Sequence, residues 1–94
     1  MKPSAKLVVK VVEEHKWPCV HADVHIHLGR HGDLYGVTNA RGQCRFDILH
    51  YPPLAYVAVA MDGFRDEVYP IMLGNSITVS ICHLRTVRRA NLQA

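Results

Sequence analysis

Short runs in which apolar and polar residues alternate are the feature that most constrains the fold of this chain. Residues 20–28, VHADVHIHL, carry an apolar side chain at every second position. Successive side chains of a β-strand point to opposite faces of the sheet, so this run predicts a strand with one buried face and one exposed face. Comparable runs recur about every 8–12 residues and no stretch has a helical period, which is typical of an all-β sandwich or barrel.

Seven runs of this kind are separated by turns that contain glycine, proline or asparagine. They cover approximately residues 7–12, 22–28, 34–38, 44–48, 54–61, 64–73 and 77–84. Pro70 marks the sixth run as an edge strand, because proline cannot donate a hydrogen bond to a neighbouring strand. In the last run Ile77, Val79 and Ile81 share one face, and we expect Cys82 to lie half-exposed on the opposite face. One domain of 94 residues with seven strands predicts an all-β, antiparallel β-sandwich of two packed sheets.

Three segments, residues 9–26, 36–49 and 58–64, carry a longer pattern of turn and strand residues. It is a valine strand, an acidic residue, a turn and a proline, then alternating apolar residues, then Gly-x-Thr-Asn-x-x-Gly, and a strand that ends in Gly-Phe. The positions are Val11, Glu13, Pro18, Ala22, Val24, Ile26, Gly36, Thr38, Asn39, Gly42, Cys44, Phe46, Val57, Val59, Gly63 and Phe64. In these positions the chain resembles the carboxypeptidase regulatory-like domains, whose fold is a seven-stranded, prealbumin-like (transthyretin-like) Greek-key β-sandwich.

The resemblance covers roughly residues 6–84, which we expect to form the sandwich domain. Residues 1–5 would be an N-terminal extension and residues 85–94 a basic, flexible tail. Lys16 and His21 stand where the resembled domains have glycine, and Cys44 stands where they have an aromatic residue; we expect Cys44 to pack as a small buried side chain. Domains of this family mostly act as non-catalytic modules beside other proteins, so the resemblance implies a binding or interaction module.

The polar face of residues 20–28 is rich in histidine. His25 and His27 lie two positions apart, with Asp23 and His21 on the same face and His31 in the following turn. Alternate residues of a strand are about 6.8 Å apart, so two imidazoles can converge on one ion at ~2.0–2.1 Å. Imidazole and carboxylate ligands suit Zn, Cu or Ni, and the five residues are therefore a candidate metal site. They equally suit the ordinary polar outer face of a strand, which needs no metal.

We identify no catalytic residues and predict that the chain is not an enzyme. Hydroxyisourate hydrolases share the prealbumin-like fold, but they carry a C-terminal Tyr-Arg-Gly-Ser and a histidine in the first strand, and this chain has neither. Cys82 and His83 are neighbours in the sequence, yet adjacent strand residues face opposite ways. Their thiol and imidazole therefore cannot form a nucleophile and its base.

Several kinds of partner stay open. Trp17, Tyr35, Tyr51 and Tyr56 lie in or near predicted loops and outer faces, where stacking rings can bind carbohydrate or peptide. Exposed edge strands can also pair with a partner's strand or with a second copy of the chain. The net charge of +3 lies partly in the tail and no aromatic and basic surface accompanies it, so we expect no specific nucleic-acid binding.

Hydropathy and cysteine usage bear on the compartment. The longest apolar runs are far shorter than the ~20 residues of a membrane helix, so we predict no membrane span, and no signal peptide is recognisable at the N-terminus. The three cysteines cannot all pair within one chain, and none form a C-x-x-C motif. This favours free thiols in a reducing compartment such as the cytoplasm.

Overall fold

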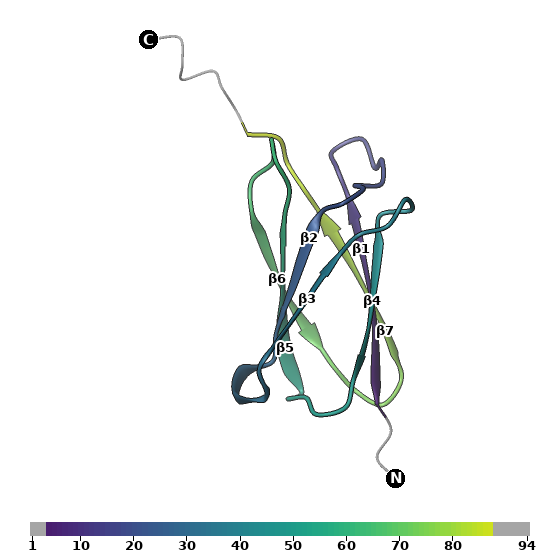
Figure 1. Cartoon of the computed structure of the whole chain (residues 1–94), viewed down its shortest axis with the longest axis vertical. Helices are drawn as coiled ribbons and strands as arrows, with labels where there is room; N and C mark the ends of the chain where they lie inside the picture. The colour runs from purple at the N-terminus through teal and green to yellow at the C-terminus, as the bar shows by residue number, and fades with distance from the viewer. Residues whose placement is uncertain (1–3, 88–94) are drawn as a thin grey trace.

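The computed structural model describes residues 4–87, and within them seven strands form two sheets (Figure 1). The strands are β1 (Ala5–Val12), β2 (Asp23–His27), β3 (Asp33–Val37), β4 (Gln43–Ile48), β5 (Leu54–Ala60), β6 (Glu67–Met72) and β7 (Ile77–His83), with one 3₁₀ turn, η1 (Gly29–His31), between β2 and β3. One sheet has the strand order β4-β1-β7 and the other β3-β2-β5-β6. The prediction of an all-β fold with two sheets is confirmed.

One strand pair departs from the predicted antiparallel arrangement. β1 pairs with β4 in the antiparallel sense but with β7 in the parallel sense. A chain that turns back at each connection sends its odd-numbered strands in one direction and its even-numbered strands in the other. β1 and β7 are both odd-numbered, so they must run parallel when the fold brings them side by side.

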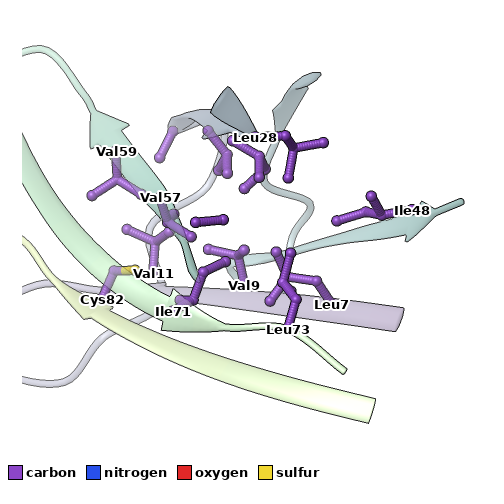
Figure 2. Close-up of a cluster of buried hydrophobic side chains, with 14 of the residues drawn as sticks. Leu7, Val9, Val11, Leu28, Ile48, Val57, Val59, Ile71, Leu73 and Cys82 are labelled. Carbon is purple, nitrogen blue, oxygen red and sulfur yellow. The ribbon is translucent and has the colours of Figure 1, made fainter. Parts of the chain in front are cut away.

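The core lies between the two sheets. Leu7, Val9 and Val11 of β1 have no exposed surface, and Figure 2 shows their side chains pointing toward those of β5 and β6. The buried cluster is Ala5, Leu7, Val9, Val11, Cys19, Ala22, Val24, Ile26, Leu28, Ile48, Ala55, Val57, Val59, Ile71, Leu73, Cys82 and Leu84. The inward positions of β1 and β2 agree with the alternation in the sequence. Burial of this set against the opposite sheet is what stabilises each strand.

The inward face of β7 is the reverse of what its hydropathy suggests. Ile77, Val79 and Ile81 are 65%, 52% and 54% exposed, whereas Cys82, expected to be half-exposed, is completely buried. Leu84, just after β7, is also completely buried. Because side chains alternate along a strand, placing Cys82 and Leu84 in the core forces the three larger aliphatic residues into solvent.

The turns keep the geometry that the sequence pattern implies. Asn39 accepts hydrogen bonds at Oδ1 from the amides of Arg41 and Gln43, at 2.9 and 3.1 Å, and Gly42 has a φ of 73°. Lys16 and His21, which stand in place of glycine, also adopt positive φ values of 66° and 63°. The left-handed conformation costs a non-glycine residue about 1–2 kcal/mol, so the turns are retained at the expense of local strain.

Cys44 and Gly36 close one side of the sandwich. Cys44 is half-buried and packs against the core, so its predicted burial is only partial. A Cβ atom on Gly36 would lie 2.5 Å from Cys44 Sγ and 3.1 Å from the ring of Phe46. Glycine at this position therefore allows β3 to approach the inner side chains of β4.

The ordered domain extends slightly beyond the range 6–84. Ala5 begins β1 and is buried, and the amides of Arg65 and Val87 donate to the carbonyls of Arg85 and Gly63. Residues 85–87, predicted to be part of a flexible tail, are thus tied to the loop before β6. Residues 1–3 and 88–94 lie outside the described residues. Within residues 4–87, no helix is long and apolar enough to cross a membrane.

Thr38 fixes the start of β2 relative to β3. It is the polar residue with a fully buried side chain in the described part of the chain. Its hydroxyl accepts a hydrogen bond from the amide of Ala22 at 2.8 Å and donates one to the carbonyl of Cys19 at 2.5 Å. These two bonds anchor the segment that leads into β2, since both backbone groups would otherwise be buried without a partner.

Replacing Thr38 by valine is expected to destabilise the fold. The substitution keeps the shape of the side chain but leaves two buried backbone groups unpaired, at roughly 1–3 kcal/mol for each. Thr38→Ser keeps the hydroxyl and loses one methyl group, so it is expected to cost less than about 1 kcal/mol. Chemical denaturation of both variants measures the difference, and equal free energies of unfolding would contradict this role.

Candidate metal site

β2 presents three polar side chains to the outside of its sheet. Val24 and Ile26 are buried in the core, so the alternation along the strand turns Asp23, His25 and His27 outward. β2 is hydrogen-bonded between β3 and β5, so the outer residues of those two strands lie on either side of its own outer residues. This position holds the histidine side chains on a rigid interior strand rather than on a loop.

His25, His27 and Asp33 come together on this outer face. Asp33 Oδ1 lies 3.7 Å from His25 Nε2 and 3.4 Å from His27 Nδ1. One possible ligand atom from each of the three residues lies within 4.8 Å of the other two. In residues 4–87 no other set of three histidine, cysteine or acidic side chains converges in this way.

The hairpin between β2 and β3 delivers Asp33 to the site. His27 is directly opposite Asp33 in the antiparallel register, and His25 is opposite Tyr35. The connection is set by the 3₁₀ turn and by Gly29 and Gly32, whose φ values are 61° and 96°. The sequence predicted a turn between these two strands but did not assign Asp33 to the site. The missing information was the length of the turn, which decides that His27 lies opposite Asp33; residues directly opposite have Cβ atoms about 4.5–5.5 Å apart.

His25 is the most constrained member of the cluster. Its ring stacks on Tyr35, with centroids 4.2 Å apart and planes at 21°, and lies 3.8 Å from the ring centroid of His27. His25 Nε2 is buried and has no hydrogen-bond partner among the described residues. A buried polar atom without a partner costs free energy, and this one faces the carboxylate and the second imidazole.

Three of the five predicted ligands lie outside the cluster. Asp23 is on the same face as His25 but opposite Val37 and Ala60, and its pair is the second along this face from the pair that contains Asp33. His21 is exposed before β2, and His31 is exposed in η1. The structure therefore brings together His25 and His27, as the sequence suggested, and adds Asp33.

The donor set fits a small divalent transition-metal ion. Metal–ligand bonds of 2.0–2.1 Å in tetrahedral geometry imply ligand atoms ~3.3–3.4 Å apart. The distances from Asp33 Oδ1 to the two imidazole nitrogens, 3.4 and 3.7 Å, are close to this value, and the three ligand atoms lie within 4.8 Å of one another. Asp33 is 44% exposed and both imidazoles are partly exposed, which leaves the ion accessible from solvent.

Aromatic residues border this cluster but do not form one platform. Tyr35 stacks on His25, and Tyr56 is opposite His27 on β5. A hollow of about 410 Å³ lies beside His27 and is lined in part by Tyr51 and Tyr56. Trp17 is 69% exposed in the loop between β1 and β2. Carbohydrate or peptide binding by these rings stays a prediction.

The cysteines do not form a nucleophilic site within residues 4–87. Cys82 faces the core, with its Sγ atom 3.7 Å from Ser80 Oγ, while the neighbouring His83 is exposed. Burial raises the pKa of the Cys82 thiol, and it also raises the pKa of Cys19 and Cys44. The cysteines are free thiols, and the thiolate form that attacks electrophiles is disfavoured in each of them.

Comparisons with known proteins bear on the fold and not on the site. No protein-family model matches the sequence, and no curated protein matches it. Among solved structures, the chain is similar to the Bacillus anthracis TIE protein, with a TM-score of 0.74 and 14% sequence identity. The match covers 90% of this chain but 17% of that chain, so this chain spans a small part of the TIE protein's length. Together with the two sheets, the likeness supports a β-sandwich fold.

The buried thiols are expected to resist alkylation in the native protein. A raised pKa lowers the thiolate fraction at any given pH, so labelling by iodoacetamide at about pH 8 should be much slower than in guanidinium-denatured protein. The difference between the labelling rates of native and denatured protein should become smaller as the pH rises, because more thiolate forms in the native protein. Mass spectrometry of labelled peptides measures each site, and rapid native labelling of Cys82 would contradict its burial.

Proposed function

We propose that this chain is a non-catalytic binding module whose ligand is a divalent transition-metal ion held by His25, His27 and Asp33. The observation that carries the proposal is the convergence of two imidazoles and a carboxylate on the outer face of β2 and β3. The buried Nε2 atom of His25 has no hydrogen-bond partner within residues 4–87, and this supports the proposal because coordination would supply one. The carboxylate would offset part of the charge of the ion.

The proposed fold family is the prealbumin-like Greek-key sandwich of the carboxypeptidase regulatory-like type. Its support is the pattern of turn residues together with their conformations: Gly42 and Gly63 have positive φ, and so do Lys16 and His21 in place of glycine. Phe64 follows Gly63 and packs against the core, as a Gly-Phe corner requires. Modules of this type mostly lack catalysis of their own, which is why we propose binding rather than chemistry.

Zn, Cu and Ni are the metals that the ligand set favours. Imidazole and carboxylate bind all three, and geometry alone does not select among them when the ligands lie on an open sheet face. The Irving–Williams order then predicts the tightest binding for Cu²⁺ among the divalent ions of the first transition row. Mg²⁺ and Ca²⁺ prefer oxygen ligands and should bind weakly.

Calorimetry on tag-free protein tests the site directly. The wild type is expected to bind Cu²⁺ more tightly than Zn²⁺ or Ni²⁺, and each of His25→Ala, His27→Ala and Asp33→Asn should weaken binding by at least about tenfold. Affinity should also fall as the pH is lowered, because a protonated imidazole cannot coordinate.

Two variants of nearby residues serve as matched controls. Asp23→Asn changes the same face of β2, and His31→Ala removes an exposed histidine of η1, yet neither residue belongs to the cluster. Both are expected to bind metal like the wild type. The proposal fails if the wild type shows no binding heat, or if the controls weaken binding as much as the cluster variants.

A further inference from the structure

The free edge of β7 differs from the other sheet edges in the described chain. Edge strands are β3, β4, β6 and β7. β4 carries Arg45 and Asp47, β6 carries Glu67 and Pro70, and β3 begins at Asp33. Charged residues and proline are the usual means by which an edge strand avoids pairing with another chain. β7, with the sequence ITVSICH, has no proline and no acidic or basic residue other than its terminal histidine.

The hydrogen bonds show which backbone groups of β7 point to this free edge. The amide of Leu84 donates to the carbonyl of Val12 in β1, so the even-numbered residues of β7 bond toward β1. The odd-numbered residues point away from it. At His83, both backbone groups bond to the hydroxyl of Tyr69, which accepts from the amide at 3.0 Å and donates to the carbonyl at 2.8 Å. Tyr69 thus covers one end of the edge, and within residues 4–87 Ile77, Val79 and Ile81 stay exposed.

We propose that β7 pairs antiparallel with β7 of a second copy of this chain, about a two-fold axis at Val79. In this register Ile77 lies opposite Ile81 of the second copy, and Val79 lies opposite its own counterpart. All three residues direct their backbone groups to the free edge, so the pairing would add about six backbone hydrogen bonds. It ends where Tyr69 occupies the groups of His83.

A second copy fits this edge because the edge is complementary to itself. Pairs of β-branched aliphatic side chains directly opposite each other stabilise antiparallel strands, and every outward pair in this register is of that kind. Ile77, Val79 and Ile81 are among the large exposed apolar residues, and the pairing would merge two such stripes on one continuous sheet face. Residues 77–82 of β7 have no acidic or basic side chain, so the paired segment has no like-charge repulsion between the copies.

The size of the contact indicates a reversible dimer. A seven-residue strand is ~23 Å long and the spacing between packed sheets is ~10 Å, so edge pairing covers roughly a few hundred Å² on each copy. Stable complexes bury about 800 Å² on each partner. We therefore expect weak association, which dilution reverses.

Paired charge substitutions test both the dimer and its register. Ile77 and Ile81 lie beside Lys6 and Lys10 of β1, so Ile77→Glu/Ile81→Glu should leave the monomer folded while placing like charges across the two-fold axis. Ile77→Glu/Ile81→Lys instead places opposite charges across it. Sedimentation velocity is expected to show a concentration-dependent dimer for the wild type, a monomer for the first variant and a restored dimer for the second.

The controls separate this interface from other modes of association. Val68→Glu alters a similarly exposed residue on β6 and should leave the dimer unchanged. EDTA, which would dissociate a metal-bridged dimer, should also leave it unchanged. A wild type that stays monomeric up to about 1 mM overturns the proposal. So does association of the Glu/Glu variant like the wild type, monomeric behaviour of the Glu/Lys variant, or loss of the dimer in EDTA or in Val68→Glu.

Hydrogen exchange gives a readout at single residues. The amides of Ile77, Val79 and Ile81 should exchange quickly in dilute protein and become protected as the concentration rises. The amides of Thr78 and Ser80, which face β1, should be protected at every concentration. Protection of the three outward amides that does not depend on concentration would overturn the strand pairing.

Discussion

Burial of the inner face of β2 between the two sheets is the constraint on which the candidate site depends. Val24 and Ile26 are enclosed between the sheets. Because side chains alternate along a strand, their burial fixes the outward direction of the alternate residues. His25 and His27 are therefore held outward at adjacent positions on one face. A slip of one residue would bury both imidazoles and expose the two aliphatic side chains, at the loss of about 1.5–3 kcal/mol for each aliphatic residue.

The hairpin between β2 and β3 adds Asp33 to the two histidines and so completes a three-residue cluster. Once β2 is fixed, the 3₁₀ turn determines which residue of β3 lies opposite His27, and that residue is Asp33. Thr38 then fixes the other end of the same pair of strands through two buried hydrogen bonds. The β2–β3 pair that carries the site is thus fixed at both ends by local contacts. The positions of the two imidazoles depend on β2, which is an interior strand.

The two outer faces of the sandwich differ in chemistry for the same physical reason. On β2, burial of the apolar residues leaves polar groups outside, where they can meet a charged ligand. On β7, burial of Cys82 and Leu84 leaves aliphatic residues outside, along a strand that forms an edge of its sheet in the described part of the chain. One alternation rule therefore produces a polar candidate site on one sheet and an apolar edge on the other.

The sequence by itself determined the all-β class, the inward residues of β1 and β2, the Asn39–Gly42 turn and the histidine pair. These depend on local alternation and turn chemistry, which a single strand or turn already contains. Tertiary structure alone decided that Asp33 joins the pair, that β1 and β7 run parallel, and that Cys82 is buried while Ile81 is exposed. The physical reason is that register and facing are properties of two strands together: hydropathy shows that a strand has two different faces, and only its neighbours determine which face is covered.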